Sequence, residues 1–192
     1  AMLARYSTIS REDLKANLQH FLSEVVPVAQ EAGCIMVIHP DDPPRSILGL
    51  PRIFSTQEDV KALLEMVDNP ANGVCFCAGS FSGRLDNNIV EMFKACAPRV
   101  GFIHLRSTQH DSEGNFFEAN HLEGCVDMYG LVKAIIEEQL RRKKEGRADW
   151  QIPFRPDHGH TMLDDLSKPP CPNPGYTAIG RLKGLAEIRG LE

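Results

Sequence analysis

The chain has 192 residues, of which 42% are hydrophobic and 24% charged, so it can form one domain with a buried core. Its formal net charge of −5 argues against a nucleic-acid-binding protein, which would normally present a basic face. Its apolar runs fall well short of the roughly 18 residues that a membrane span needs, so we expect no membrane partner.

The first helical pattern and the first apolar run set the order of elements. Residues 10–32 are predicted to form an amphipathic helix that Ser10 caps and that Pro27 kinks or breaks. Gly33 ends this pattern. The continuous apolar run "CIMVI" at 34–38 is typical of a parallel strand buried on both faces.

The same order then repeats three times. Thr56 caps a helix that ends near residue 68 and precedes the strand "GVCFC" at 73–77. A helix at 85–97 precedes "VGFIH" at 100–104. A helix from Asp127 to about residue 145 precedes "WQIPF" at 150–154 and ends in a basic run at 141–144 that should face solvent. A last helix is predicted from about 178 to 189.

Strands that alternate with helices of this length imply βαβ units and a parallel sheet, hence an α/β fold. Four such units are half of a TIM-type (β/α)8 barrel, which takes ~250 residues when whole. We therefore expect residues 1–192 to form a single domain that is a partial barrel, apparently its C-terminal half. An open four-stranded α/β sheet is the alternative.

Cysteine usage and the N-terminus indicate the compartment. The six cysteines (34, 75, 77, 96, 125 and 171) form no CxxC pair and are not dense enough for a disulfide framework. The N-terminus lacks a signal-peptide pattern. We therefore expect reduced thiols in a cytoplasmic protein.

A potential metal ligand follows each predicted strand. His39, Cys77 and His104 end the first three, and the fourth runs into "RPDHGH" (155–160), which holds Asp157 and His158. Taken singly, these are most often structural histidines, a buried thiol and a turn residue. Functional groups of parallel α/β proteins gather at the carboxyl ends of the strands, so together they favour a shared divalent cation.

Side chains alternate along a strand, which separates donors from their neighbours. Cys75 points the same way as Cys77 but one layer lower, so we expect it to be packed. Arg106 shares the face of His104 one step further out, where it could grip a carboxylate or pair with a barrel acid. A thiolate suits Zn²⁺, whereas His and carboxylate suit Mn²⁺ or Fe²⁺ equally well, so the ligand types leave the metal open.

The loops after the strands supply further candidates. In "HPDDPPR" (39–45), Asp41 and Asp42 could orient His39 or bind substrate hydroxyls, or could simply form a turn. His121 in "EANHLEG" could be a site residue or could fasten its loop. Tyr176 in "NPGY" could lean over the site or be a surface tyrosine.

Several motifs together resemble the mannonate dehydratase family: "HPDDPPRSILGLPRI", "CFCAGS", "FIHLRS", "HLEGCVDMYG", "RPDHGH" and "NPGYTAIGRLKGLAEIRG". The resemblance runs from about residue 10 to the end, over the C-terminal half of that family's chain. It implies a TIM-barrel hydro-lyase of glucuronate and other hexuronate breakdown, which converts D-mannonate to 2-keto-3-deoxy-D-gluconate with Mn²⁺ or Fe²⁺. The metal ligands it implies are His39, Cys77, His104 and Asp157, and the catalytic residues it implies are His158 and Tyr176.

These residue types suit dehydration of a sugar acid. One group must take the proton beside the carboxylate and another must protonate the departing hydroxyl, while a chelated metal would stabilise the developing charge. The sequence leaves open which of His158 and Tyr176 is base and which is acid. Arg106 and Arg84 are candidates for binding the substrate carboxylate. Asp41 and His121 are further candidates for substrate contact.

Two rival interpretations remain, one within the enzymes and one from another class. Another divalent-metal barrel, such as a sugar isomerase, would turn over aldoses and leave mannonate untouched; an abasic-site endonuclease is disfavoured by the negative charge. Alternatively, the chain alone is a non-catalytic half-barrel module. Half a barrel exposes two sheet edges, so we expect it to pair with the missing half or with itself as a homo-oligomer, and to be inactive alone.

Overall fold

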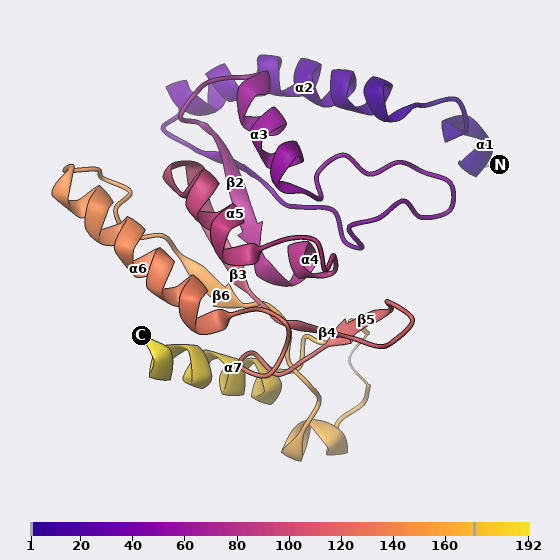
Figure 1. The fold of residues 1–192 in the computed structure, drawn as a ribbon, viewed down its shortest axis with the longest axis vertical. Coiled ribbons are helices and arrows are strands. Elements are labelled where there is room, and N and C mark those ends of the chain that lie inside the picture. Colours follow the sequence, from indigo (N-terminus) through magenta and orange to yellow (C-terminus); the bar gives the residue numbers. More distant parts are fainter. Residues whose placement is uncertain (1, 171) are drawn as a thin grey trace.

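A four-stranded parallel sheet organises the computed structural model, which describes residues 2–170 and 172–192 (Figure 1). Its strands lie in chain order: β1 (Met36–Ile38), β2 (Asn72–Cys77), β3 (Val100–Leu105) and β6 (Phe154–Pro156). Each neighbouring pair is parallel. Successive strands that lie side by side are the product of repeated crossovers in one direction. The predicted α/β class with a parallel sheet is confirmed.

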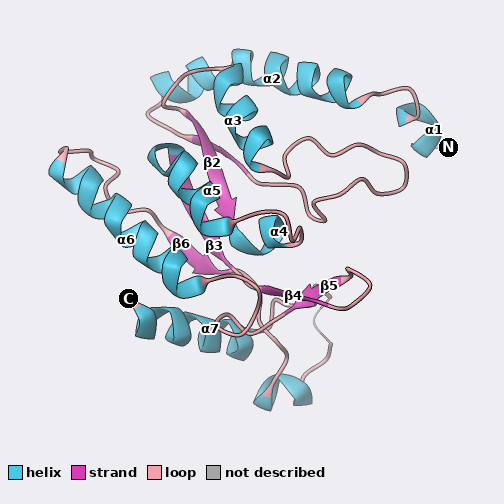
Figure 2. Ribbon diagram, viewed as in Figure 1, coloured by secondary structure: helices cyan, strands magenta, loops and turns pink. Residues whose placement is uncertain are grey.

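The helices before, between and after the strands form a layer that follows the order of the sheet (Figures 1 and 2). They are α2 (Arg11–Glu31), α3 (Gln57–Met66), α5 (Ile89–Cys96), α6 (Met128–Lys144) and α7 (Ala178–Leu191). Each packs on the next: α2 on α3, α3 on α5, α5 on α6 and α6 on α7. None of the described helices has the length and apolar content to cross a bilayer.

The core lies between this helical layer and the sheet. Phe76 of β2 stacks edge-on against Phe93 of α5, with 5.3 Å between ring centroids. Ile103 of β3 is fully buried in the same cluster. Because side chains alternate along β2, Cys75 and Cys77 point to the opposite face from Phe76, away from α5. That opposite face carries the polar side chains.

The predicted helix starts are largely confirmed, because short polar side chains accept the first free backbone N–H groups. Ser10 forms a capping box with Asp13, and Thr56 and Asp127 cap α3 and α6. The break expected at Pro27 is wrong, since α2 runs through it. Packing of an amphipathic face can stabilise a helix that local propensity disfavours. Val26, beside the proline, is completely buried, so this packing keeps the helix continuous through Pro27.

The two outer strands differ most from the prediction. The first strand begins at Met36 and is only half-buried, because it lies at the edge of the sheet. The fourth begins at Phe154 and extends to Pro156, two residues beyond the predicted end. Pro153 has no N–H to donate, although its carbonyl still accepts from Ile103 N–H at 3.0 Å.

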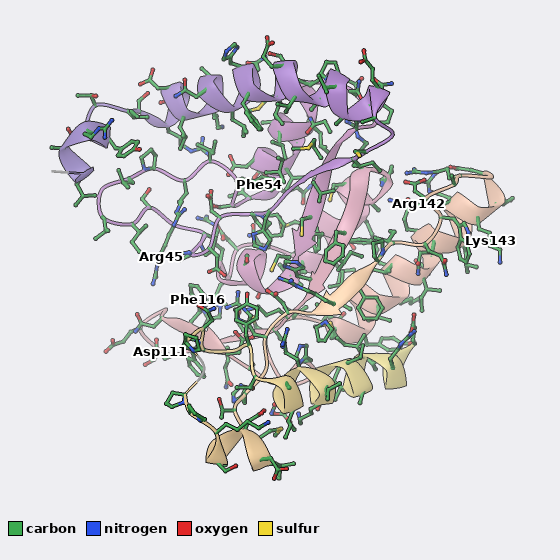
Figure 3. All side chains as sticks on the ribbon, turned by 180° about the vertical axis from the view of Figure 1, so that it is seen from behind. Arg45, Phe54, Asp111, Phe116, Arg142 and Lys143 are labelled. Carbon is green, nitrogen blue, oxygen red and sulfur yellow. The ribbon has the colours of Figure 1, made fainter. Side chains whose placement is uncertain are left out.

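Short elements fill the connections. They are α1 (Met2–Tyr6), α4 (Ala78–Ser82), η1 (Ala97–Arg99), the antiparallel pair β4 (Thr108–His110) and β5 (Phe116–Glu118), and η2 (Leu163–Ser167). The β4–β5 hairpin follows β3 directly and was not predicted. The Arg45 guanidinium lies 5.9 Å from the Phe116 ring centroid, so the loop after β1 meets this hairpin (Figure 3).

The basic run at the end of α6 does not face solvent throughout. Arg142 is 1% exposed and donates to the carbonyls of Ala97 and Val100 at 2.6 and 2.8 Å. Its charge is balanced by Glu138, four residues earlier on the same helix. Arg142 therefore ties α6 to the start of β3, far from the Arg45–Phe116 contact (Figure 3).

The described cysteines 34, 75, 77, 96 and 125 are free thiols. Cys171 lies outside the described residues.

Candidate metal centre

Three of the predicted donors converge beyond the carboxyl ends of neighbouring strands. His39 follows β1, Cys77 ends β2 and His104 lies in β3, and one ligand atom of each lies within 4.8 Å of the other two. The sheet register pairs Cys77 directly with His104. Nε2 of His39 is 3.2 Å from Nδ1 of His104. Parallel strands in register thus bring together residues that are far apart in the sequence.

Asp157 brings a fourth donor to this cluster. Its Oδ2 atom lies 3.5 Å from His104 Nδ1 and 4.0 Å from Cys77 Sγ. Its other oxygen, Oδ1, accepts from Arg155 Nη2 at 2.8 Å. The carboxylate is 4% exposed. Arg155 therefore holds one oxygen of Asp157 while the other faces the cluster.

The donor atoms of His39 and Cys77 are oriented by their own loops. His39 Nδ1 lies 2.7 Å from the Pro40 carbonyl, which can only accept, so the ring donates there and presents Nε2. Cys77 Sγ accepts from the backbone N–H and the hydroxyl of Ser80 at 3.4 and 3.1 Å. These two contacts hold the sulfur in place at the end of β2.

The residues present therefore fit a divalent cation. Two imidazoles, one thiolate and one carboxylate are ligand types that transition metals share. Cys77 and His104 are buried, whereas His39 is exposed. The candidate metal centre is thus enclosed around β2 and β3 and open beside β1.

The predicted catalytic residues lie next to this centre and touch each other. His158 Nε2 is 3.1 Å from the Tyr176 hydroxyl, and the two rings meet edge to face with centroids 4.8 Å apart. The same nitrogen is 3.7 Å from Asp157 Oδ2. Burial raises the pKa of Tyr176, and the charge of Asp157 acts in the same direction, so the hydroxyl keeps its proton.

Two glycines seat this loop on α7. A Cβ on Gly159 would lie 2.3 Å from the Gly180 carbonyl carbon, and one on Gly180 would lie 2.2 Å from the His160 oxygen. Neither distance is tolerable, so both positions need glycine. Gly159 also donates its N–H to the Gly175 carbonyl at 2.9 Å, which brings Tyr176 alongside. The proline and glycine of "RPDHGH" thus frame a loop that the first turn of α7 supports.

Arg106 is held between two carboxylates. Its Nη1 atom is 2.6 Å from Asp42 Oδ2, and its Nε atom is 2.9 Å from Glu118 Oε2. Burial lowers the pKa of this guanidinium, but the charges of Glu118 and Asp42 outweigh it and the net change is upward. Gly79 makes room for it, since a Cβ there would lie 2.3 Å from Arg106 Cδ. Of the two roles considered for Arg106, these contacts match pairing with acids of the fold.

Glu118 is a site residue that the sequence did not reveal. It ends β5 and its Oε2 atom lies 2.7 Å from His158 Nδ1. The surrounding letters "NFFEAN" form no recognisable motif, and only the hairpin carries the carboxylate to His158.

Asp41 and Arg84 make local contacts. Asp41 Oδ2 accepts from the backbone N–H groups of Ile53 and Phe54 at 2.9 and 2.8 Å, which fastens the loop after β1. Arg84 Nε donates to Asp86 Oδ1 at 3.0 Å on an exposed part of the surface. Their contact with substrate stays a prediction.

His121 lies against α7. It is 4% exposed, and a Cβ on Gly184 would lie 2.2 Å from its ring. Burial lowers its pKa, so the neutral ring is favoured. This packing matches a residue that fastens its loop, and a role in substrate binding stays a prediction.

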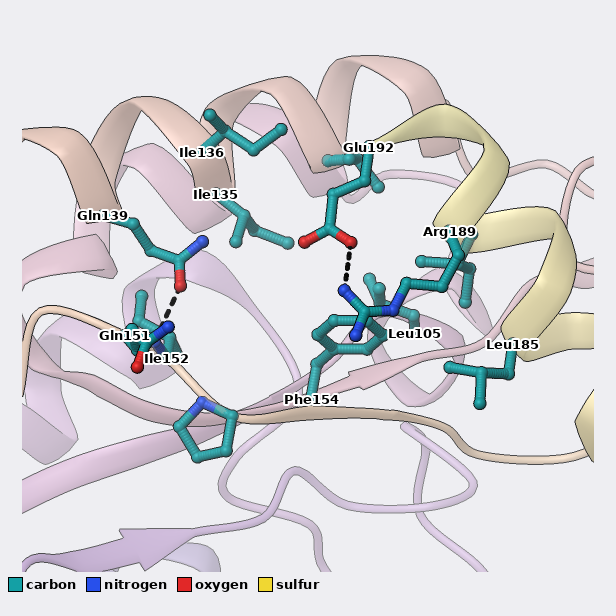
Figure 4. Close-up of a pocket in the computed structure, with 13 residues that line it drawn as sticks. Leu105, Ile135, Ile136, Gln139, Gln151, Ile152, Phe154, Leu185, Arg189 and Glu192 are labelled. Carbon is teal, nitrogen blue, oxygen red and sulfur yellow. Dashed lines mark hydrogen bonds and ion pairs between the residues drawn. The ribbon is translucent and has the colours of Figure 1, made fainter.

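A separate cavity of about 460 Å³ lies between α6, β6 and α7 (Figure 4). Its lining is mostly apolar, with Ile135, Phe154 and Ile188 among the side chains. The four donor residues are not part of that lining. The chemistry-bearing groups therefore occupy the other face of the sheet.

Comparison with known proteins gives consistent matches. The model of the D-mannonate dehydratase (UxuA) family matches residues 1–192. Mannonate dehydratase 2 of Agrobacterium fabrum is 48% identical over 191 residues, covering 100% of this chain and 47% of that protein. The mannonate dehydratase of Chromohalobacter salexigens is 50% identical over 192 residues, covering 100% of this chain and 48% of that protein.

A solved structure agrees. The crystal structure of mannonate dehydratase from Streptococcus suis serotype 2 superposes with a TM-score of 0.86 at 36% sequence identity. The match covers 98% of this chain and 51% of that one. The chain thus spans about half the length of the relatives it matches.

Proposed function

Because the chain belongs to the D-mannonate dehydratase family, whose model it matches over residues 1–192, we propose that it carries the catalytic centre of a hydro-lyase that converts D-mannonate to 2-keto-3-deoxy-D-gluconate. The observation that carries this proposal is the position of the His158–Tyr176 pair. It lies 3.7 Å from Asp157, beside the cluster of metal-ligand types.

We propose Mn²⁺ or Fe²⁺ for this centre on the family resemblance, since the ligand types by themselves also suit Zn²⁺. His39 Nε2, Cys77 Sγ, His104 Nδ1 and Asp157 Oδ2 would hold it. When bound, such an ion supplies a Lewis acid for the carboxylate and 2-hydroxyl of the substrate. Burial of Cys77 and His104 keeps water away from part of this site and strengthens every charge interaction within it.

His158 and Tyr176 then divide the proton transfers. The C2–H bond breaks as a base takes the proton, and the C3–O bond breaks as an acid protonates the leaving hydroxyl, which departs as water. The resulting enol tautomerises to the 2-keto acid. Tyr176 suits the acid, because its raised pKa keeps the hydroxyl protonated. His158 suits the base, because its Nε2 atom lies 3.1 Å from the protonated Tyr176 hydroxyl and can accept a hydrogen from it.

We further propose that the four β/α units are half of a TIM-type barrel. The helices cover one face of the sheet, and the donor groups gather at the carboxyl ends of its strands, as barrel enzymes require. Among the described residues, β1 and β6 each pair with a single neighbour, so both ends of the sheet are open. The rest of the family's length would close the sheet between them, and a second copy of the chain is the other candidate partner.

A product assay of the full-length protein tests this function. After loading with Mn²⁺, it should convert D-mannonate to a 2-keto acid that can be followed by the absorbance of its semicarbazone. Absence of product from a metal-replete, folded protein would contradict the proposal. Turnover of aldoses with mannonate untouched would instead support a sugar isomerase.

A further inference from the structure

His158 is contacted at both ring nitrogens by groups of different elements. Nδ1 lies 2.7 Å from Glu118 Oε2, which comes from the β4–β5 hairpin. Nε2 lies 3.1 Å from the Tyr176 hydroxyl. Asp157 Oδ2 also approaches Nε2, but at 3.7 Å it is too far for a hydrogen bond. Each nitrogen therefore has one partner within hydrogen-bonding distance.

The carboxylate of Glu118 is held in place by Arg106. Arg106 Nε lies 2.9 and 3.2 Å from its two carboxylate oxygens. Arg106 is 6% exposed and is anchored in turn by Asp42 at 2.6 Å. A carboxylate held against a buried guanidinium is ionised, and an ionised carboxylate can only accept hydrogen bonds.

The protonation pattern of the imidazole follows from this acceptor. Since Glu118 can only accept, the hydrogen at the 2.7 Å contact must sit on His158 Nδ1. A neutral imidazole carries one N–H, so Nε2 is left as the acceptor. The Tyr176 hydroxyl can then donate to Nε2.

We propose that Glu118 is a positioning residue that locks His158 in its Nδ1–H tautomer and so leaves Nε2 as the basic atom. The catalytic part of this inference rests on the proposed function, whereas the tautomer does not. Glu118 reaches His158 across 40 residues of sequence and links it to Arg106 and Asp42. Three loops at the carboxyl end of the sheet thus set the orientation of a single ring.

Packing supports the same orientation. A Cβ on Gly175 would lie 3.2 Å from His158 Cγ, and Gly175 has a φ of +88°, a conformation that favours glycine. The turn before Tyr176 therefore packs directly against the His158 ring. With Glu118 on one side and Tyr176 on the other, a ring flip would exchange both hydrogen bonds.

Nitrogen NMR of the full-length protein tests the tautomer directly. The protein is labelled with [¹⁵N]histidine and loaded with Zn²⁺, which is diamagnetic, and His158→Gln identifies the signals of His158. We expect Nδ1 of the unaltered protein to show a protonated-nitrogen shift and Nε2 a lone-pair shift. Glu118→Gln should keep this pattern, because its amide oxygen can still accept from Nδ1–H. Glu118→Ala should lose it. The same pattern in Glu118→Ala, or the opposite tautomer in the unaltered protein, would overturn the proposal.

Kinetics of the same variants give the second readout. For Glu118→Ala we expect kcat to fall by about 10²–10⁴-fold, the usual worth of a general acid or base, with a much smaller change in KM. Glu118→Gln should recover part of the loss. Glu113→Ala, at the exposed tip of the same hairpin, is the matched control and should keep full activity. An equal loss in kcat for Glu118→Ala and Glu113→Ala would point to hairpin damage and contradict the positioning role. A protein with the expected NMR pattern but no activity on mannonate would contradict the proposed function alone.

Discussion

Cys75 and Cys77 lie two residues apart on one face of β2 but differ in their surroundings. Cys77 Sγ accepts two hydrogen bonds from Ser80 and faces His104 and Asp157. Cys75 lies one layer lower, where burial raises the pKa of its thiol to about 12. A thiol that keeps its proton is a poor metal ligand.

The two cysteines should therefore respond differently to substitution. We expect Cys77→Ser to weaken Mn²⁺ binding by more than the ~10–100-fold that loss of an outer partner of a metal ligand costs. Cys75→Ser should bind Mn²⁺ nearly as well as the unaltered protein. Isothermal titration calorimetry of both variants measures the difference, and equal losses would show that Cys77 is not a ligand.

The buried thiol of Cys96 should make the free energy of unfolding decrease at alkaline pH. Its Sγ–H donates to the Met92 carbonyl at 3.3 Å, and burial raises the pKa of the thiol from 9.0 to about 12. The folded chain thus holds this proton at pH values where the unfolded chain releases it. The contribution is complete below the unfolded pKa and is lost as pH rises toward the folded one.

We accordingly expect the urea concentration at the unfolding midpoint of the unaltered protein to decrease when the pH is raised from about 8 to about 10. Cys96→Ala should be less stable at the lower pH, because it leaves a small cavity, but its midpoint should fall less steeply with pH. Urea unfolding followed by circular dichroism at both pH values gives the two slopes. Identical slopes would mean that other groups carry the pH dependence.

The clustering of the candidate metal ligands could be predicted from sequence, whereas their supporting residues could not. His39, Cys77 and His104 each end an apolar run, so the phase of the strand alone places them at one edge of the sheet. Glu118 follows no such run and reaches His158 only through a hairpin. The partners of Arg106 likewise depend on how two loops meet in space.

At the level of elements, the contact between α7 and the loop at 157–160 depends on two facing glycines. A methyl group on Gly180 would press on the His160 backbone at 2.2 Å, and backbone has little room to move. Gly190 lies in the same helix with nothing within 4 Å of its position. The two positions form a matched pair.

We expect Gly180→Ala to destabilise the protein by about 1–3 kcal/mol, the usual cost of overpacking. It should also weaken Mn²⁺ binding, because Asp157 belongs to the displaced loop. Gly190→Ala should be neutral or slightly stabilising, since alanine favours a helix over glycine by up to about 1 kcal/mol. Thermal unfolding and metal titration measure both effects. If the Gly180→Ala protein were as stable as the Gly190→Ala protein, the contact between α7 and the backbone of His160 would have room for a methyl group.

Element types were easier to predict than element limits. Helices and strands of the βαβ units follow from hydrophobic period and from caps such as Ser10 and Asp127. Pro27 indicated a break that burial of its neighbour Val26 overrides. Arg142 resembled a solvated end of a helix, yet two carbonyls and Glu138 satisfy it inside the fold. Such tertiary partners are not visible in a local pattern.

At the scale of the whole molecule, the sheet has two ends with no further strand among the described residues. β1 and β6 each leave one row of backbone groups unpaired, which favours association with another chain. The exposed His39 lies beside one of these ends, so the candidate metal centre also opens in that direction.

The 192-residue chain by itself should therefore be inactive on D-mannonate and should self-associate as its concentration rises. Full-length protein should be active and should not show this concentration-dependent growth in mass. Sedimentation velocity and the 2-keto acid assay on both proteins test the two expectations. A monomeric, fully active 192-residue chain would contradict the half-barrel proposal.

The hydrogen bond from Gly159 to Gly175 joins the two ends of the loop between them, so that these ends lie side by side. The described part of the loop between these two residues is also tied to α7, because Asp165 of η2 accepts from the Ile179 N–H at 3.0 Å. His158 and Tyr176 therefore keep their spacing through two attachments, one at the base of the loop and one on the helix. A fluorophore or an affinity peptide grafted into this loop would spare the reaction only where it leaves the contact of Asp165 with α7 intact.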